Sequence, residues 1–450
     1  MRKLRGVAIR EFGKLAIRVL WIIIVVFVFM GGPAEAIFAD YAADMNSPIS
    51  PRARAHYQYF KNHFEQPFDG YGVTDVFTNQ FAVVLLSHAA VGFLNTGLAI
   101  PAYRNEVGKL LTEVTKRATS TKVSPYKKNL EHVRRFGDHN LYLSHVNLIL
   151  GARRRITEDT KFDKLHRRIT RHLAKRSTAR ANAHASSYPG SARFPADQTV
   201  TLASLYLYDL CHQTDLSKQP VRRWLDYMKL KATHKKTGLY RSSLSRSFKN
   251  SKLPRGCALS WSTLYMAQFA PNEAMEQYTR YRDLFFIDIL GWGGFREYPP
   301  GVNGSMDVDS GPIFFGMGMA ATGLGLGATR LFGDRRGYVS ILRTASSFGL
   351  PDTVFSRRNH RLSPLLGEAI LFHGITAGRW DEPSNKGQKE AASAFTEKSP
   401  FPFGAMLLFM AFCGILFVNV KTTIKRARSW MLVVDSLRCC ADSLSESSLK

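Results

Sequence analysis

The sequence predicts an all-α protein in which paired helices form a closed ring, an (α/α)6 toroid of helical hairpins. Six apolar segments rich in small residues recur about every 55 residues, and a more charged, helix-like stretch lies between successive segments. Continuous strand-like alternation of apolar and polar residues is hard to find, which disfavours a β-rich fold. The six segments begin near Phe81, Leu141, Asp197, Cys257, Gly311 and Leu365.

Two kinds of helix alternate along the chain. Residues 81–96 are apolar on nearly every face, as in a helix that is buried on all sides. Residues 161–176 instead place apolar side chains on one stripe and basic side chains elsewhere, which indicates an amphipathic surface helix. The stripe consists of Phe162, Leu165, Ile169 and Leu173. An inner helix touches its neighbours and the lumen, so this alternation predicts inner helices surrounded by outer ones.

The composition limits the classes of function. The chain has 450 residues, of which 45% are hydrophobic, and a formal net charge of +27. The positive charges are spread along the predicted outer helices and turns, which favours a solvated basic exterior facing an anionic membrane or cell wall over nucleic-acid binding. The five cysteines have no metal-ligand spacing, so we expect no metal and no cofactor.

Both ends of the chain indicate a membrane protein. A basic N-terminal stretch precedes a short apolar run and a small-residue motif at Ala34-Glu35-Ala36, which is typical of an export signal. Residues 401–418 are apolar and are followed at once by basic residues, which stay on the cytoplasmic side of a membrane. We therefore expect a bacterial inner (cytoplasmic) membrane protein whose main domain lies on the periplasmic or extracytoplasmic side.

These signals divide the chain into five parts. We expect a signal peptide or signal anchor at 1–36, the toroid at 37–375, a linker at 376–400, a transmembrane helix at 401–420 and a cytoplasmic tail at 421–450. Whether the signal is cleaved stays open, as does the alternative that 401–418 is a buried core helix.

Ionisable side chains gather where the apolar segments begin. A carboxylate in a partly apolar mouth has a raised pKa and acts as a general acid, whereas one that accepts backbone N–H bonds stays ionised and acts as a base. Histidine serves either role near neutral pH. The predicted catalytic residues are Asp197, Asp309, His145 and His139. The predicted substrate-binding residues are Arg255, Arg296, Tyr188, Trp261, Tyr298 and Asp307.

Each candidate also has a purely structural interpretation. Asp197 and Asp309 stand where a carboxylate caps a helix, and His145 lies on an apolar face, as a core histidine does. Cys257 is expected to be a small buried residue. We favour chemistry because acids, histidines and arginines recur at the same position of several repeats.

The stretch Asp138-His139-Asn140-Leu141-Tyr142-Leu143-Ser144-His145, with Phe194-Pro195-Ala196-Asp197 after it, resembles inner-helix motifs of the linalool dehydratase/isomerase family. The resemblance implies an (α/α)6 barrel that hydrates, dehydrates and isomerises an alkenol by acid–base chemistry without a metal. It also implies an acid–base role for His145. The family's cysteines on the approach to the next inner helix are not retained, since Ser186, Ser187 and Ala196 occupy that region.

Two functions of different classes follow. The first is an enzyme, a metal-independent lyase of the hydratase/dehydratase type or a hydrolase, that acts on a small organic or glycan substrate. The second is a non-catalytic toroid that binds an envelope glycan or a protein partner. The oligomeric state is left open.

Overall fold

The computed structural model is mostly helical, which confirms the all-α prediction. It describes residues 17, 32–47, 49–73, 75–76, 80–190, 193–244, 253–349, 360, 363–381, 395, 397, 401–415, 418 and 421–422. Most of the predicted signal, the greater part of the linker and nearly all of the cytoplasmic tail lie outside the described residues.

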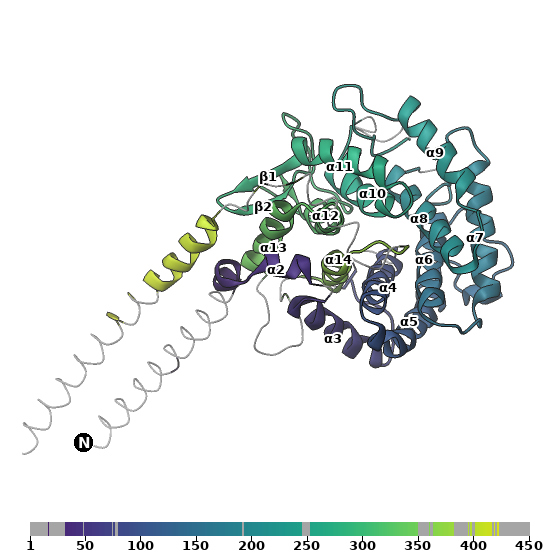
Figure 1. Ribbon diagram of the computed structural model, residues 1–450, viewed down its shortest axis with the longest axis horizontal. Coiled ribbons are helices and arrows are strands. Elements are labelled where there is room, and N and C mark those ends of the chain that lie inside the picture. Colours follow the sequence, from purple (N-terminus) through teal and green to yellow (C-terminus); the bar gives the residue numbers. More distant parts are fainter. Residues whose placement is uncertain are drawn as a thin grey trace, which may run out of the picture.

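Six helices pack against one another in a closed cycle (Figure 1). Each contacts the next one in chain order, and the last contacts the first. They are α4 (Phe81–Ala99), α6 (Asn140–Ile156), α8 (Pro195–His212), α10 (Gly256–Phe269), α12 (Met319–Leu331) and α14 (Leu365–Thr376). Most of their side chains are buried, which explains why their sequences show no clean polar face.

A second set of helices lies outside this cycle (Figure 1). It comprises α3 (Pro51–Glu65), α5 (Arg104–Thr119), α7 (Asp163–Thr178), α9 (Lys218–Lys231), α11 (Pro271–Phe285) and α13 (Arg335–Gly349). The α5 helix packs against α4 and α6, α7 against α6 and α8, α11 against α10, and α13 against α12. On α7 the predicted apolar stripe is buried while the basic side chains lie outside it, so this helix is amphipathic as expected. Short helices α2 (Tyr41–Asn46), η1 (Pro101–Tyr103) and η2 (Leu130–His132) connect the larger ones.

The seam between α14 and α4 closes the cycle. Phe372 of α14 is fully buried and lies against Gly92 of α4, where a side chain would collide with its ring. Its ring also stacks on Phe60 of α3 at 5.6 Å and meets Phe93 edge-on at 5.4 Å. The glycine therefore makes room for the aromatic side chain that joins the two ends of the cycle.

The predicted helix from Gly311 onward is wrong in its first part. Residues 313–318 form a two-stranded antiparallel hairpin of β3 (Ile313–Phe314) and β4 (Met317–Gly318). The helix α12 begins only at Met319. The backbone reaches positive φ at Gly311, Phe315 and Gly316, and such a conformation is incompatible with a right-handed helix. A second hairpin, β1 (Phe286–Ile289) paired antiparallel with β2 (Trp292–Phe295), also precedes α12.

A C-terminal helix, Phe403–Ile415, docks on the turn of this hairpin. The Gly404 N–H donates to the Leu290 carbonyl at 2.8 Å, and Gly404 lies against the Trp292 ring. Further along, the helix keeps large apolar side chains exposed, among them Leu407, Met410 and Ile415. Within the described part of the chain, only α4 is long and apolar enough to cross a membrane, judged by length and composition alone. The α4 helix is buried inside the ring.

We predict that Gly92→Ala destabilises the protein, because the Phe372 ring is enclosed by aromatic neighbours and has no free space to move into. Overpacking of a core costs about 1–3 kcal/mol, which outweighs the gain of about 1 kcal/mol from replacing glycine in a helix. Urea unfolding of the purified chain in detergent measures the difference.

Gly323→Ala on α12 is the matched control. An added Cβ would lie 3.5 Å from Ile370 Cγ2, an ordinary contact. This variant should be as stable as the wild type or more stable by up to about 1 kcal/mol. Equal effects of the two substitutions would show that the seam is not tightly packed.

Candidate functional site

The two predicted catalytic carboxylates interact at one mouth of the helix cycle. Asp197 lies in the first turn of α8, and Asp309 lies in the segment that precedes α12. Withdrawal from water and the negative charge of Asp309 together raise the pKa of Asp197 to about 7, and the Ser187 hydroxyl opposes this. The charges of these two carboxylates therefore interact, although α10 lies between the helix entries that carry them.

Tyr188 completes this group. It lies in the segment before α8 and is half-buried. Burial raises the pKa of its phenol well above the ordinary range, and the charges of Asp197 and then Asp309 raise it further. The phenol is therefore neutral and able to donate a hydrogen bond toward a group held between the carboxylates.

A charged network stands beside the pair, at the entry of α10. Arg255, the residue before α10, donates from Nε to Glu297 at 2.8 Å. Its two terminal nitrogens donate to the two Asp307 oxygens at 2.7 and 2.9 Å. Asp307 also accepts backbone N–H bonds from Asp309 and Ser310. Partial burial would raise the pKa of Asp307, but the hydrogen bonds from Arg255 and Ser310 and the charge of Arg255 together outweigh it and lower the pKa.

Glu297 is the residue of this network that the sequence prediction missed. Its carboxylate is fully buried and accepts hydrogen bonds from the Cys257 thiol and the Cys257 backbone N–H, both at 3.1 Å. Burial, with Glu297 next to it, raises the pKa of the Cys257 thiol well above its usual range, so Cys257 stays protonated. Burial also raises the pKa of Glu297, although Arg255 opposes this.

The feature that could have indicated Glu297 is the alternation of side-chain direction along the end of strand β2. Arg296, directly after strand β2, still pairs with Met317, and side chains along a strand point alternately to opposite sides. Phe295 and Glu297 are fully buried, whereas Arg296 between them is only half-buried. Arg296 was predicted to anchor substrate, but its neighbour Glu297 is the residue that joins the network; the described contacts of Arg296 are made by its backbone.

His145 lies deeper in the ring. Its Nδ1 is 2.5 Å from Ser87 Oγ of α4, and its ring meets Trp261 of α10 edge-on at 5.8 Å. Burial lowers the pKa of His145 to about 3, and His88 adds to the effect. At this depth the imidazole of His145 is neutral near pH 7 and packs against its neighbours. It does not take up a second proton there.

Other buried rings complete this layer. His88 of α4 shares a hydrogen bond of 2.9 Å with His373 of α14, Nδ1 to Nδ1, and both rings face Tyr265 of α10. Trp261, predicted to bind substrate, belongs to this layer, because it contacts His88 and His145. Three of its buried polar atoms have no hydrogen-bond partner among the described residues: His88 Nε2, Trp261 Nε1 and Tyr265 OH.

Two further candidates lie at the periphery. His139 precedes α6, is half-exposed and packs edge-on against Tyr126, with no described contact to Asp197 or Asp309. Tyr298 lies under the Arg255 guanidinium, 5.5 Å from ring centre to carbon, and donates its hydroxyl to the Ser305 carbonyl. Tyr298 therefore packs beside the charged network.

The segment that carries Asp307 and Asp309 also exposes apolar side chains. Phe314 is 61% exposed and Phe315 82% exposed, and three further apolar residues of the segment are exposed as well. These are Met306, Val308 and Met319. Such a concentration of exposed apolar side chains is typical of a surface that binds an apolar partner or ligand.

Two other features lie away from the mouth. A surface depression of about 840 Å³ runs between α3 and α5 and is lined by residues such as Glu106, Lys109 and Glu113. His56, His360 and Glu368 form the one metal-like grouping found among the described residues. None of these residues contacts the mouth carboxylates in the described contacts.

Comparison with known proteins gives no relative: no protein-family model matches the chain, and no curated protein matches it.

The raised pKa of Asp197 makes a prediction for stability. The folded state holds this proton up to about pH 7, whereas an unfolded aspartate loses it at about pH 4. The contribution to stability is therefore fully present below about pH 4 and is lost as the pH rises through 7. Asp197→Asn, which cannot ionise, should gain roughly 1–3 kcal/mol relative to wild type between pH 5 and pH 8, less than the full linkage value because Asp197 is partly exposed.

Unfolding in urea at both pH values measures this difference. Asp215→Asn, on an exposed aspartate paired only with Lys218 in its own turn, is the control and should show no such dependence. An Asp197→Asn difference that is constant from pH 5 to pH 8 would mean that Asp197 is ionised throughout.

Proposed function

We propose that the protein is an acid–base enzyme, a lyase of the hydratase/dehydratase type, whose site is the mouth of an (α/α)6 toroid. One observation carries the proposal: Asp197, with a pKa near 7, interacts with a second carboxylate, Asp309, at one mouth. A group with such a pKa both gives and takes a proton at neutral pH. The closed cycle of inner helices and the family resemblance support the toroid.

The proposed reaction needs one acid and one base. Protonated Asp197 gives its proton to the hydroxyl oxygen of an alcohol, the C–O bond breaks, and water leaves. Burial and the charge of Asp307 raise the pKa of Asp309, and Arg255 opposes this. We assign Asp309 as the base because it is more exposed than Asp197; it takes a proton from the adjacent carbon, whose C–H electrons form the alkene bond. Exchange with solvent restores both carboxyl groups, and the reverse sequence hydrates an alkene.

The other mouth residues are assigned supporting parts. Tyr188 donates a hydrogen bond to the departing oxygen, and Arg255 holds the Asp307 turn that carries Asp309. His145 stays neutral and belongs to the buried layer of rings at the bottom of the proposed site. The exposed apolar segment around Phe314 and Phe315 favours a hydrocarbon-like alcohol over a sugar as the substrate.

The alternatives have weaker support. A glycan hydrolase also uses two carboxylates, but Trp261, an aromatic residue predicted to bind substrate, is part of the inner layer. A non-catalytic binding module predicts Asp197 and Asp309 as separate helix caps. Asp197 instead lies in the first turn of α8, after the N-cap residue Phe194, and the described hydrogen bonds include none from a backbone N–H to its carboxylate.

The test is alcohol–alkene interconversion by the full chain in detergent, followed by gas chromatography with a panel of allylic and tertiary alcohols. Asp197→Asn and Asp309→Asn should each lower kcat about 10²–10⁴-fold, because each removes one proton-transfer group. Asp215→Asn is the surface control and should keep wild-type turnover. Unchanged turnover in both mouth variants would exclude this assignment.

We further propose that the ring is tethered to a bacterial inner membrane, with its body outside the cytoplasm and residues 401–420 spanning the bilayer. The exposed apolar side chains of Phe403–Ile415 support this, as does the contact of Phe409 with Phe38 of the N-terminal region at 6.5 Å. The described helix is shorter than a full span of about 20 residues, and the remainder of the predicted span includes undescribed residues.

Protease treatment of spheroplasts that express the chain with a C-terminal tag tests this topology. External protease should degrade the body, while a small tagged fragment stays protected by the membrane. A cytoplasmic protein fused to the same tag is the control and should survive intact. Loss of the tag together with survival of the body would reverse the orientation.

A further inference from the structure

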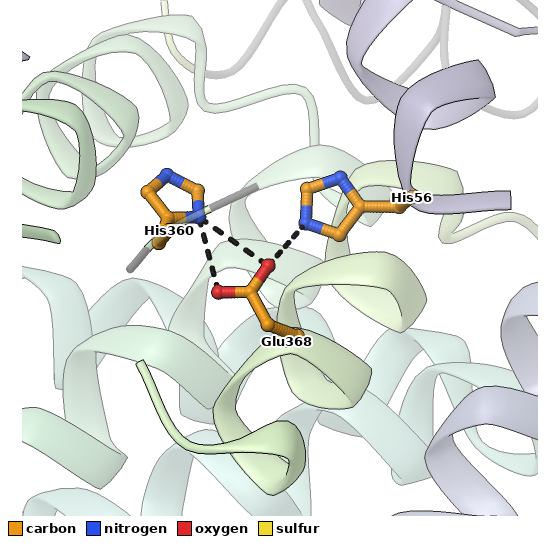
Figure 2. A group of neighbouring side chains, drawn as sticks. All are labelled: His56, His360 and Glu368. Carbon is orange, nitrogen blue, oxygen red and sulfur yellow. Dashed lines mark hydrogen bonds and ion pairs between the residues drawn. The ribbon is translucent and has the colours of Figure 1, made fainter. Parts of the chain in front are cut away.

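Three buried side chains converge at the seam between the outer and inner helices (Figure 2). His56 comes from α3, Glu368 from the first turn of α14, and His360 from the chain before α14. Each is at most 2% exposed. One ligand atom of each residue lies within 4.8 Å of the other two.

The orientation of His56 shows what its second nitrogen faces. Nδ1 lies 3.0 Å from the Arg52 carbonyl oxygen, which can only accept, so Nδ1 carries a hydrogen. In a neutral ring Nε2 then presents a lone pair, and it lies 3.1 Å from the Glu368 carboxylate oxygen Oε2. Two electron pairs facing each other inside a core require a proton or a metal cation between them.

His360 faces the same carboxylate from the other side. Its Nδ1 lies 3.2 and 3.4 Å from the two Glu368 oxygens. Figure 2 marks both contacts with dashed lines. Its Nε2 is buried and has no hydrogen-bond partner among the described residues. The carboxylate thus sits between two imidazole nitrogens, with its charge enclosed.

The spacing and the surroundings fit a metal. Ligands held about 2.0–2.1 Å from a tetrahedral zinc ion lie about 3.3–3.4 Å from one another. Glu368 Oε2 lies 3.1 Å from His56 Nε2 and 3.4 Å from His360 Nδ1, and the ligand atoms all lie within 4.8 Å of one another. A metal-bound histidine characteristically donates its other N–H to a backbone carbonyl, as His56 does to Arg52.

We propose that His56, His360 and Glu368 bind a divalent transition-metal ion, Zn²⁺ by preference, as a structural clamp between α3 and α14. The ion would take two imidazole nitrogens and the carboxylate, and water would complete its coordination. This proposal does not depend on the proposed enzyme activity.

The position of the clamp indicates its purpose. The helix α14 contacts α4 and closes the cycle, and it also packs against α3. Phe372, one turn beyond Glu368, stacks on the His56 ring at 6.4 Å with an interplanar angle of 8°. A metal ion here joins residues 56 and 368, which are far apart in the chain, at the point where the last inner helix meets the first part of the fold.

Metal analysis of the full chain, purified in detergent without chelator, is the first measurement. We expect about one Zn²⁺ per chain, a lower Tm after removal with a chelator, and recovery of Tm on adding Zn²⁺. Titration of the stripped protein with Co²⁺ should give the visible absorption of a tetrahedral site, which needs no variant.

Glu368→Gln removes one ligand and should weaken Zn²⁺ binding more than the roughly 10–100-fold that loss of an outer hydrogen-bond partner costs. Its Tm should no longer respond to chelator or Zn²⁺. His184→Gln is the matched control, since His184 is buried and accepts a hydrogen bond from Trp224, and it should keep the metal even if its Tm falls.

The proposal is overturned if the stripped wild type gives no tetrahedral Co²⁺ spectrum and its Tm is unchanged by Zn²⁺. Protons would then bridge the three side chains. If Glu368→Gln does not fold, His56→Gln replaces it, and the wild-type Co²⁺ titration still decides.

Discussion

The contact of α14 with α4 is the constraint on which the rest of the molecule depends. Six helices share one mouth only if the last packs against the first, and this contact requires close approach. Gly92 leaves space for the Phe372 ring, and on the neighbouring pair Gly374 lies so near Gly327 that a Cβ would stand 3.1 Å from its backbone nitrogen. Small residues on the inner helices therefore serve the closure, since bulkier ones would push the helices apart.

The periodicity of the sequence was sufficient to predict the inner helices but not their approach segments. The α4 and α14 helices begin at the predicted residues, and α6, α8 and α10 begin within two residues of them. The segment before α12 was missed because its glycines resemble the small residues of a packed helix. At Gly316 a positive φ turns the chain into the β3–β4 hairpin, and hydrophobic periodicity carries no signal for that turn.

The candidate site was predictable where position along the chain was enough. Asp197, Arg255 and Asp307 lie at helix entries, and adjacent entries meet at one end of the cycle. How deep a side chain lies in the ring was not predictable, because an all-apolar helix gives no indication of which face points to the lumen. The sequence therefore could not show that His145 and Trp261 lie in the inner layer. The grouping of His56 with Glu368 was not predictable either, since residues so distant in sequence are brought together only by the packing of α3 on α14.

The raised pKa of Asp197 follows from what surrounds it. An arginine close to a carboxylate ordinarily lowers the carboxylate's pKa, and Arg255 stands at the next helix entry. Its charge, however, is balanced by Glu297 through Nε and by Asp307 through the two terminal nitrogens. Below Asp197 the layer of His88, His145 and His373 is neutral, because burial keeps the pKa of each imidazole low. Among the described residues no cation is left to stabilise the ionised form of Asp197, so desolvation dominates and its proton is held to neutral pH.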